Sequence, residues 1–514
     1  MLVKNLKSSR LMAPLAGDKA QRLAEGVLRH LTQMHVYPQS IVFINRAVFF
    51  LGQRNTGKYL GIVSPNKNMG TQFEGQQESS SVNKLSVNTT IAPTSSQNAA
   101  RLRNILPFLN ATTVGLKKSA GCGDRLGLAT PGHIRSIRKT PLFPVFAQQS
   151  VRENERTGRS PQTVLDDAMW GVFQEGWRDG FGADADHLKT TADTDTFVAA
   201  GYTFYTIDPG DHVDNTAATS SYEDLRQKVE ILPWDSLQST PADLKRALLA
   251  KPIDLKNFSL QITEAELMQA AVKYGRVVDY TAAIYRHLVE RMNDRPFELE
   301  ISVDETESVT TVSEHIYIAS ELERLGVKWV SLAPRYVGTF EKGVDYIGDL
   351  TEFEKYFEQH ISVAQTLGPY KLSIHSGSDK FSIYPVAARL AGELIHLKTA
   401  GTSYLEALRT LSQFNPDLFK EIVYYAIDCY PSDRASYHVS ADISQIPDLR
   451  AVSDRELPDL LENFHAREVL HVTYGSVINH PHLRGPFFEA LHLHEEAYTK
   501  ILETHFDKHF NAFK

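Results

Sequence analysis

The stretch 298-ELEISVDETESVTTVSEHIYIASELERLGVKWVSLAPRYVG-338 decides the fold. It opens with alternation, because Leu299, Ile301 and Val303 are apolar while the residues between them are polar or charged, ending at Asp304. A helical pattern follows over 316–326, and a second strand pattern begins at residue 328. The stretch 370-YKLSIHSGSDKFSIYP-385 likewise ends a strand pattern in polar residues. Strands with one apolar face and a polar face that ends in reactive side chains are typical of the lining of a (β/α)₈ barrel.

Similar strand patterns recur on both sides of this stretch, and helical patterns lie in most of the intervals between them. They lie at 124–130, 142–149, 180–189, 202–208, 297–305, 328–336, 370–377 and 394–401. Strands that alternate with helices indicate a parallel sheet, and eight of them predict closure into a barrel. We therefore predict an α/β protein with a (β/α)₈ TIM-type barrel.

The rest of the chain predicts attachments to this barrel. We expect an N-terminal extension over 1–100 with a mobile polar loop at 66–100, because that segment has few large apolar residues. The barrel is expected over 101–410, with an insertion at about 209–296 after the fourth strand. A mainly helical C-terminal region, 411–514, is predicted to carry one further strand at 468–475. We interpret its four histidines within 491–510 as part of a solvated helix rather than a second metal site.

Composition excludes several classes of protein. The 514 residues carry a formal net charge of −8 and no basic run, which argues against nucleic-acid binding. No apolar segment approaches the roughly 18 residues of a membrane helix, and no secretory h-region precedes the barrel. The two cysteines, Cys122 and Cys429, are expected to be reduced. We expect a cytoplasmic protein without nucleic-acid or membrane partners, whose oligomeric state, homo-oligomer included, stays open.

One motif resembles a nucleotide-binding loop without meeting its requirements. The segment from Gly52 to Tyr59 is close to a P-loop, but Tyr59 stands where Ser or Thr would hold magnesium. We interpret it as a turn between two strands.

Ionisable residues gather where the predicted barrel strands end, which is where the active sites of such barrels lie. By alternation the inward set is Asp184, Asp186, Asp208, Asp304, Arg335, His375, His396 and Lys398, with His187 and Glu305 one residue further. Histidines and carboxylates that converge on one mouth favour a divalent metal ion of the Zn, Mn, Co or Ni type. The alternative is an ion-pair network that closes the end of the barrel.

Cations and hydroxyls accompany these residues. Arg and Lys suit a carboxylate or phosphate, while Ser and Thr hydroxyls suit a polyol. The predicted substrate-binding residues are Arg125, Lys189, Arg335, Ser376, Ser378, Lys380, Lys398, Thr402 and Ser403. The residues alone therefore predict metal-assisted chemistry on an anionic, hydroxylated small molecule.

Long motifs of the chain resemble the tagaturonate epimerase family over about Gly121 to Arg409. They are GDRLGLATPGH (123–133), PVFAQQSVRENERTGRSPQ (144–162), GVFQEGWRDGFGADADHLKT (171–190), SVDET (302–306), SLAPRYVGTFEKGVDYIGD (331–349), HSGSDKFSIYP (375–385) and HLKTAGTSYLEALR (396–409). The resemblance implies an isomerase of hexuronate catabolism that interconverts D-tagaturonate and D-fructuronate with a metal ion and without NAD.

These two ketouronates differ at a carbinol carbon β to the ketone, so one proton abstraction beside the carbonyl cannot invert it. We expect retro-aldol cleavage, rotation of the aldehyde fragment and re-addition, with a metal ion holding the enediolate oxygens. A base and an acid on opposite faces would move the proton of the β-hydroxyl. We assign these proton transfers to Asp186 and Glu305. His187, His375 and Asp304 are the expected metal ligands, and Lys398 and Arg335 are expected to meet the substrate carboxylate.

Two other functions stay open at this point. A metal-dependent ketose or ketouronate aldolase would use the same chemistry but release the fragments. A non-catalytic barrel subunit that supports an aldolase is the alternative from another class, although its buried ionisable groups would cost desolvation without serving catalysis.

Overall fold

Eight parallel strands close into a barrel at the centre of the computed structural model, which describes residues 2–6, 18–82 and 84–514. Each strand pairs with its neighbours in chain order. In that order they are β7 (Ser119–Cys122), β8 (Phe143–Ser150), β9 (Gly182–Leu188), β10 (Phe204–Ile207), β13 (Glu298–Val303), β14 (Ser331–Pro334), β15 (Lys371–Ile374) and β16 (Ile395–Thr399). The predicted (β/α)₈ fold is confirmed.

The first barrel strand is β7 and not the predicted segment 124–130, so that prediction was wrong. Asp124 folds this segment into a turn, since its carboxylate accepts hydrogen bonds from the backbone N–H groups of Leu126, Gly127 and Ala129. Gly127 has a φ of +76°, which is outside the strand region. The true strand, Ser-Ala-Gly-Cys, lacks the large apolar residues by which a strand is recognised from sequence.

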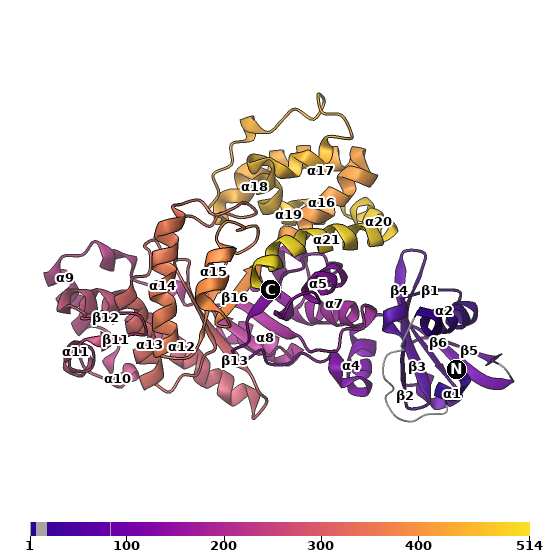
Figure 1. Cartoon of the computed structure of the whole chain (residues 1–514), viewed down its shortest axis with the longest axis horizontal. Helices are drawn as coiled ribbons and strands as arrows, with labels where there is room; N and C mark the ends of the chain where they lie inside the picture. The colour runs from indigo at the N-terminus through magenta and orange to yellow at the C-terminus, as the bar shows by residue number, and fades with distance from the viewer. Residues whose placement is uncertain (1, 7–17, 83) are drawn as a thin grey trace.

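Helices cover the outside of the barrel between successive strands. They are α5 (Thr130–Ile137), α6 (Val151–Thr157), α7 (Pro161–Gln174), α8 (Thr191–Ala200), α12 (Glu264–Met292), α13 (Val312–Arg324), α14 (Leu350–Thr366), α15 (Tyr384–Ala391) and α16 (Thr402–Phe414). The long interval between β10 and β13 holds, before α12, the elements α9 (Tyr222–Glu230), α10 (Trp234–Leu237), α11 (Pro241–Leu249), β11 (Ile253–Asp254) and β12 (Ser259–Leu260). These lie on the side of the barrel away from the N-terminal sheet (Figure 1).

An antiparallel sheet precedes the barrel, together with α1 (Leu2–Asn5) and α2 (Asp18–Thr32). Its strands are β1 (His35–Val36), β2 (Val42–Ile44), β3 (Ala47–Arg54), β4 (Gly57–Ser64), β5 (Gln76–Val82) and β6 (Leu85–Pro93). The P-loop-like segment lies in the β3–β4 hairpin, which confirms its interpretation as a turn between strands. Residues 1, 7–17 and 83 of the predicted extension lie outside the described part of the chain.

The prediction of a mobile polar loop at 66–100 was wrong. This segment contains α3 (Lys67–Gly70), β5, β6 and the start of α4 (Ser96–Ile105). Backbone pairing with β4 holds β6 in the sheet and buries Val87 and Ala92. The exposed strand β5 lies at the edge of the sheet, where polar side chains are the norm.

The C-terminal region is helical and forms the upper part of the molecule in Figure 1. It consists of α17 (Pro416–Asp433), α18 (Phe464–Val472), α19 (Tyr474–Asn479), α20 (Arg484–Leu493) and α21 (Glu495–Phe510), with three short 3₁₀ helices described between α17 and α18. The predicted strand at 468–475 was wrong, because these residues form the end of α18 and the start of α19. The Asn463 side chain caps α18 at the backbone N–H of Ala466, and a closed barrel offers no edge for another strand.

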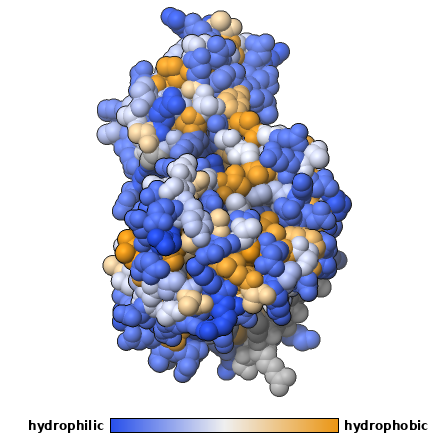
Figure 2. Space-filling view, turned by 90° about the vertical axis from the view of Figure 1, so that its left-hand side faces the viewer, coloured by the Kyte–Doolittle hydropathy of each residue, from blue (hydrophilic) through white to orange (hydrophobic). Residues whose placement is uncertain are grey.

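The face on the side of the insertion is largely hydrophilic. Figure 2 shows its hydrophobic residues in separate groups among hydrophilic ones. Within the part of the chain that the structure describes, no helix is both long and apolar enough to cross a membrane.

Candidate active site

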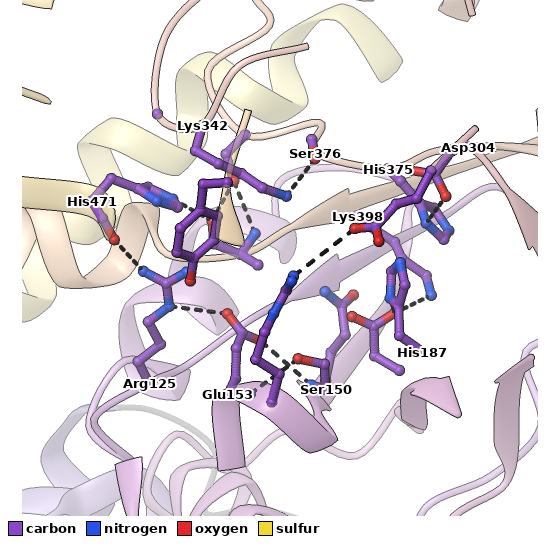
Figure 3. Close-up of a pocket in the computed structure, with 18 residues that line it drawn as sticks. Arg125, Ser150, Glu153, His187, Asp304, Lys342, His375, Ser376, Lys398 and His471 are labelled. Carbon is purple, nitrogen blue, oxygen red and sulfur yellow. Dashed lines mark hydrogen bonds and ion pairs between the residues drawn. The ribbon is translucent and has the colours of Figure 1, made fainter. Parts of the chain in front are cut away.

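A pocket opens at the C-terminal ends of the barrel strands. It is lined by Arg125, Gln148, Ser150, Arg152, Glu153, Asp186, His187, Asp304, Glu305, Lys342, Gly343, His375, Ser376, Ser378, Lys398, Ala400, Tyr437 and His471. Figure 3 shows two sides, with His187, Asp304 and His375 on one and Arg125, Glu153 and His471 on the other. The predicted position of the site, at the strand ends, is where this pocket lies.

The barrel beneath the pocket is filled by buried charges centred on Lys398. Its Nζ lies 2.7 Å from Asp184 Oδ2, 2.7 Å from Asp186 Oδ1 and 2.8 Å from Glu300 Oε1. Burial disfavours the ammonium, but the three carboxylates outweigh it and hold the pKa of Lys398 well above its usual range. The ion-pair network considered as an alternative therefore exists at the floor of the pocket, which Lys398 and Asp186 line, and it occupies the ammonium expected to meet substrate.

A bulge in β9 turns His187 into the pocket. Ala185 pairs with Tyr205 and Leu188 with Ile207, so two residues of β9 oppose one of β10. His187 has a φ of +54°, the left-handed region that a histidine rarely adopts. The alternation of the strand breaks here, and the neighbours Asp186 and His187 both reach the pocket.

His187, Asp304 and His375 bring their ligand atoms within 4.8 Å of one another, as expected for the predicted metal ligands. His187 Nδ1 lies 2.9 Å from Asp186 Oδ1, and His375 Nε2 lies 2.6 Å from Glu300 Oε1. A carboxylate outside the trio thus holds one nitrogen of each imidazole, while His375 Nδ1 lies 3.2 Å from Oδ1 of Asp304. Histidines that ligate metals are held in this way, so these three residues, hereafter the ligand trio, fit a divalent metal ion.

Electrostatics keep the carboxylates of the trio and its supports ionised. Burial opposes ionisation of Asp304, but the charge of His375 outweighs it and lowers the pKa of this carboxyl. Burial also opposes ionisation of Asp186, and the charges of His187 and Lys398 hold its pKa well below the usual range. Burial lowers the pKa of His187, yet the charge of Asp186 prevails and raises it to about 10. Metal binding here would therefore displace a proton from His187.

The opposite side of the pocket is cationic. Arg125 donates from Nε to Glu153 Oε1 at 3.0 Å and from Nη1 to the backbone oxygen of His471 at 3.0 Å. The capping box of α6 orients Glu153, because Ser150 and Glu153 exchange hydrogen bonds at the start of that helix. At the rim, Lys342 Nζ donates to Ser376 Oγ at 2.6 Å.

Several predicted substrate-binding residues lie outside this pocket. The buried Lys380 donates to the backbone oxygens of Glu341, Val344 and Ser378, and Ser403 bonds the backbone oxygen of Gly123. Lys189 pairs with Asp211 at 3.1 Å in one adjoining cavity, and Arg335 lines another. Of the predicted set, the pocket brings together Arg125, Ser376, Ser378 and Lys398. Ser378 is committed to the backbone of Ala400, from which it accepts and to which it donates.

Thr402 belongs to a second buried cluster, around Asp379 and the C-terminal helix α21. Asp379 Oδ1 lies 2.7 Å from His505 Nε2, and its Oδ2 lies 2.9 Å from Arg467 Nη2. The backbone N–H of Asp379 donates to His509 Nε2 at 2.9 Å. These histidines are buried, so the interpretation of 491–510 as a solvated helix was wrong for them. Asp379, His505 and His509 lie close enough together to hold a metal ion, but Arg467 already pairs with Asp379, so we interpret this cluster as an ion-pair network.

Sequence reasoning missed residues that line the pocket from loops and from the C-terminal helices. Arg152, Glu153 and Lys342 all lie within the motifs that resemble the family, so their positions carried a signal. Tyr437 and His471 come from the C-terminal region, where no local pattern indicates which side chains fold back over the barrel. Glu300 follows the inward alternation of β13 but lies too deep to be read as part of a site.

Comparisons with known proteins agree with one another. A family model described as tagaturonate epimerase matches residues 37–513. A tagaturonate/fructuronate epimerase from Thermotoga maritima is 41% identical over 479 residues, which cover 93% of this chain and 97% of the relative. A glycerol-complexed crystal structure of fructuronate-tagaturonate epimerase UxaE from Cohnella laeviribosi has a TM-score of 0.88 at 34% identity, covering 97% of this chain and 99% of its own. The native structure of that protein also has a TM-score of 0.88 at 34% identity, covering 96% and 99%.

Proposed function

We propose that the barrel mouth of this chain, which belongs to the tagaturonate epimerase family, interconverts D-tagaturonate and D-fructuronate. The observation that carries this proposal is that the ligand trio lies in the same pocket as the cations Arg125 and Lys342. A hydroxylated carboxylate fits between them, since its oxygen atoms suit the trio and its negative charge suits the cations. A small anionic sugar acid is thus the proposed partner, and the proposed compartment is the cytoplasm, in keeping with two free cysteines.

His187, His375 and Asp304 would hold the divalent metal ion, with Asp186 and Glu300 fixing the two imidazoles. The ion, of the Zn, Mn, Co or Ni type, would supply Lewis-acid stabilisation of negative charge on substrate oxygen. The two supporting carboxylates also pair with Lys398 Nζ, at 2.7 and 2.8 Å, which helps to fix their positions beside the imidazoles.

The inversion is proposed to proceed through carbon–carbon cleavage. Loss of the proton from the β-hydroxyl forms an aldehyde as the bond between the β- and α-carbons breaks, and its electron pair passes to the ketone fragment as an enediolate. The aldehyde fragment then rotates and presents its other face. Re-formation of the bond and return of the proton give the epimer, so atoms and electrons balance without any oxidant.

Glu305 is the side chain we propose for proton transfer. It lies at the pocket rim with 45% of its side chain exposed, and its nearest cation, Arg152 Nη2, is 3.9 Å from its Oε1. Asp186 is less suited, because Oδ1 is already 2.9 Å from His187 Nδ1 and 2.7 Å from Lys398 Nζ. A carboxylate held by two cations with a depressed pKa is a weak base, so we assign Asp186 to orienting His187.

The test is incubation of the metal-loaded protein with D-fructuronate, with and without chelator, while NMR follows the products. Appearance of tagaturonate that stops on chelation and resumes when metal is restored is the expected result. Accumulation of two three-carbon carbonyl compounds would replace the epimerase with an aldolase. Unchanged fructuronate with every metal tried would overturn the proposal and favour a subunit that supports another enzyme.

A further inference from the structure

Among the described residues, one cation of the pocket differs from the others in its partners. The pocket is lined by Arg125, Arg152, Lys342 and Lys398, of which Arg125, Arg152 and Lys398 have a carboxylate oxygen within 4.0 Å. Among the described residues, Lys342 has none, and its Nζ donates to the hydroxyl of Ser376 at 2.6 Å. Its charge is therefore available to a ligand.

The loop that carries Lys342 is fixed by buried cations on either side of it. Lys380 Nζ donates to the backbone oxygens of Glu341, at 2.7 Å, and Val344, and Arg467 Nε donates to that of Gly343 at 2.6 Å. Gly343 has a φ of +76°, and a Cβ atom there would lie 3.1 Å from His471 Cδ2. The backbone is thus held in place while the ammonium of Lys342 reaches the pocket, an arrangement that lowers the entropic cost of binding.

Two buried hydrogen-bond acceptors of the same pocket also lack donors. Gln148 Oε1 and His471 Nδ1 have no hydrogen-bond partner within the described chain, although each residue is only 1% exposed. His471 Nε2 lies 3.2 Å from the backbone oxygen of Ala400, which favours a proton on Nε2 and a free lone pair on Nδ1. Buried acceptors without donors are costly, and ligand hydroxyls would satisfy both.

We propose that Lys342 is the specificity-determining residue that binds the substrate carboxylate, while Gln148 and His471 accept hydrogen bonds from its hydroxyl groups. The inference rests on the proposed function and names the residues that recognise the acid end of that substrate. In the proposed cleavage this end belongs to the aldehyde fragment. Lys342 would hold that fragment by its carboxylate while the carbonyl turns over, which keeps it from leaving the pocket.

Lys342 replaces two expected ligands of the carboxylate. Lys398 is enclosed by three carboxylates. Arg335 lines only the adjoining cavity, whereas Lys342 lines both that cavity and the pocket. Lys342 also stands beside the ligand trio, because its partner Ser376 directly follows His375. One substrate molecule can thus present its charged end to Lys342 and its reacting carbons to the trio.

The test compares binding of D-galactonate and galactitol, which have the same carbon chain with and without a carboxylate. Calorimetry on the metal-loaded protein is expected to show galactonate bound more tightly by about 10- to 100-fold. Lys342→Met is expected to abolish this preference, and Lys342→Arg to retain part of it. Lys328→Met is the matched control. Lys328 is exposed and does not line the pocket, so this variant is expected to keep the full preference for galactonate.

Ser376→Ala tests whether Lys342 binds the carboxylate directly or acts only by holding the loop after His375 through its hydrogen bond to Ser376. If Lys342 acted only through Ser376, this variant would lose the preference as well, which would overturn the proposal. Persistence of the preference in Lys342→Met together with its loss on chelation would place the carboxylate at the ligand trio and also overturn it. These binding measurements do not depend on turnover, so they test the role of Lys342 separately from the proposed function. If the protein epimerises fructuronate but Lys342→Met keeps the preference for galactonate, the role of Lys342 is wrong and the proposed function stands.

Discussion

His187 Nδ1 lies 2.9 Å from Oδ1 of Asp186, its neighbour in the chain. In a regular strand the two side chains would point to opposite faces, and the bulge in β9 removes that separation. The pair therefore acts as one unit, in which the carboxylate fixes the imidazole and sets which nitrogen faces the pocket.

Asp186→Asn is accordingly expected to weaken metal affinity by about 10- to 100-fold, because the amide no longer fixes and polarises His187. At saturating metal, kcat should stay within a few-fold of the wild-type value. Equilibrium dialysis with metal analysis measures the first quantity, and steady-state kinetics the second. A collapse of kcat at saturating metal with unchanged affinity would restore Asp186 as a proton carrier.

Glu305→Gln should give the reverse pattern. The amide cannot accept a proton, so kcat is expected to fall by about 100- to 10,000-fold. Metal content should match the wild type, since Glu305 is outside the ligand trio. Full activity in this variant would move the proton transfer to another side chain.

Lys380→Met tests whether Lys380 binds substrate or supports the fold. Its buried ammonium donates to three backbone oxygens, and removing it leaves them unpaired. We expect a loss of about 2–4 kcal/mol in the free energy of unfolding, measured by denaturant titration. A variant of unchanged stability with a raised KM would support the role expected from sequence.

Glu468→Gln should change how stability depends on pH. Burial, reinforced by Glu341, raises the pKa of Glu468 from 4.5 to about 8. The folded protein therefore holds this proton more tightly than the unfolded chain, and the resulting stability is lost as pH rises between these two values. The Tm of the variant relative to the wild type should increase from pH 5 to pH 8 and then level off. A constant difference would mean that Glu468 titrates normally.

The sequence predicted the barrel because long alternating runs such as 297–305 are buried strands with large apolar residues. It missed β7, whose four small residues gain their strand conformation from pairing with β8 and β16. The ligand trio was predicted because strand alternation directs Asp304 and His375 inward. The place of His187 depends on a bulge that alternation cannot indicate.

Cations were harder to assign than ligands. Nothing in the sequence near Lys380 and Lys398 shows that three acceptors already surround each ammonium. Lys342 gave no stronger signal than these, although its ammonium lacks a carboxylate partner among the described residues. Which cation is free depends on charge pairing between segments that are distant in the chain, and local sequence patterns do not indicate such pairs.

The ion-pair network around Asp379 has a consequence for the order of events during synthesis. This residue follows His375 by four positions, yet its partners Arg467 and His505 come 88 and 126 residues later. Until those segments have left the ribosome, the carboxylate lacks these two ion-pair partners, and the loop beside His375 lacks their support. The barrel strands are thus all translated well before the site they carry can reach its final form.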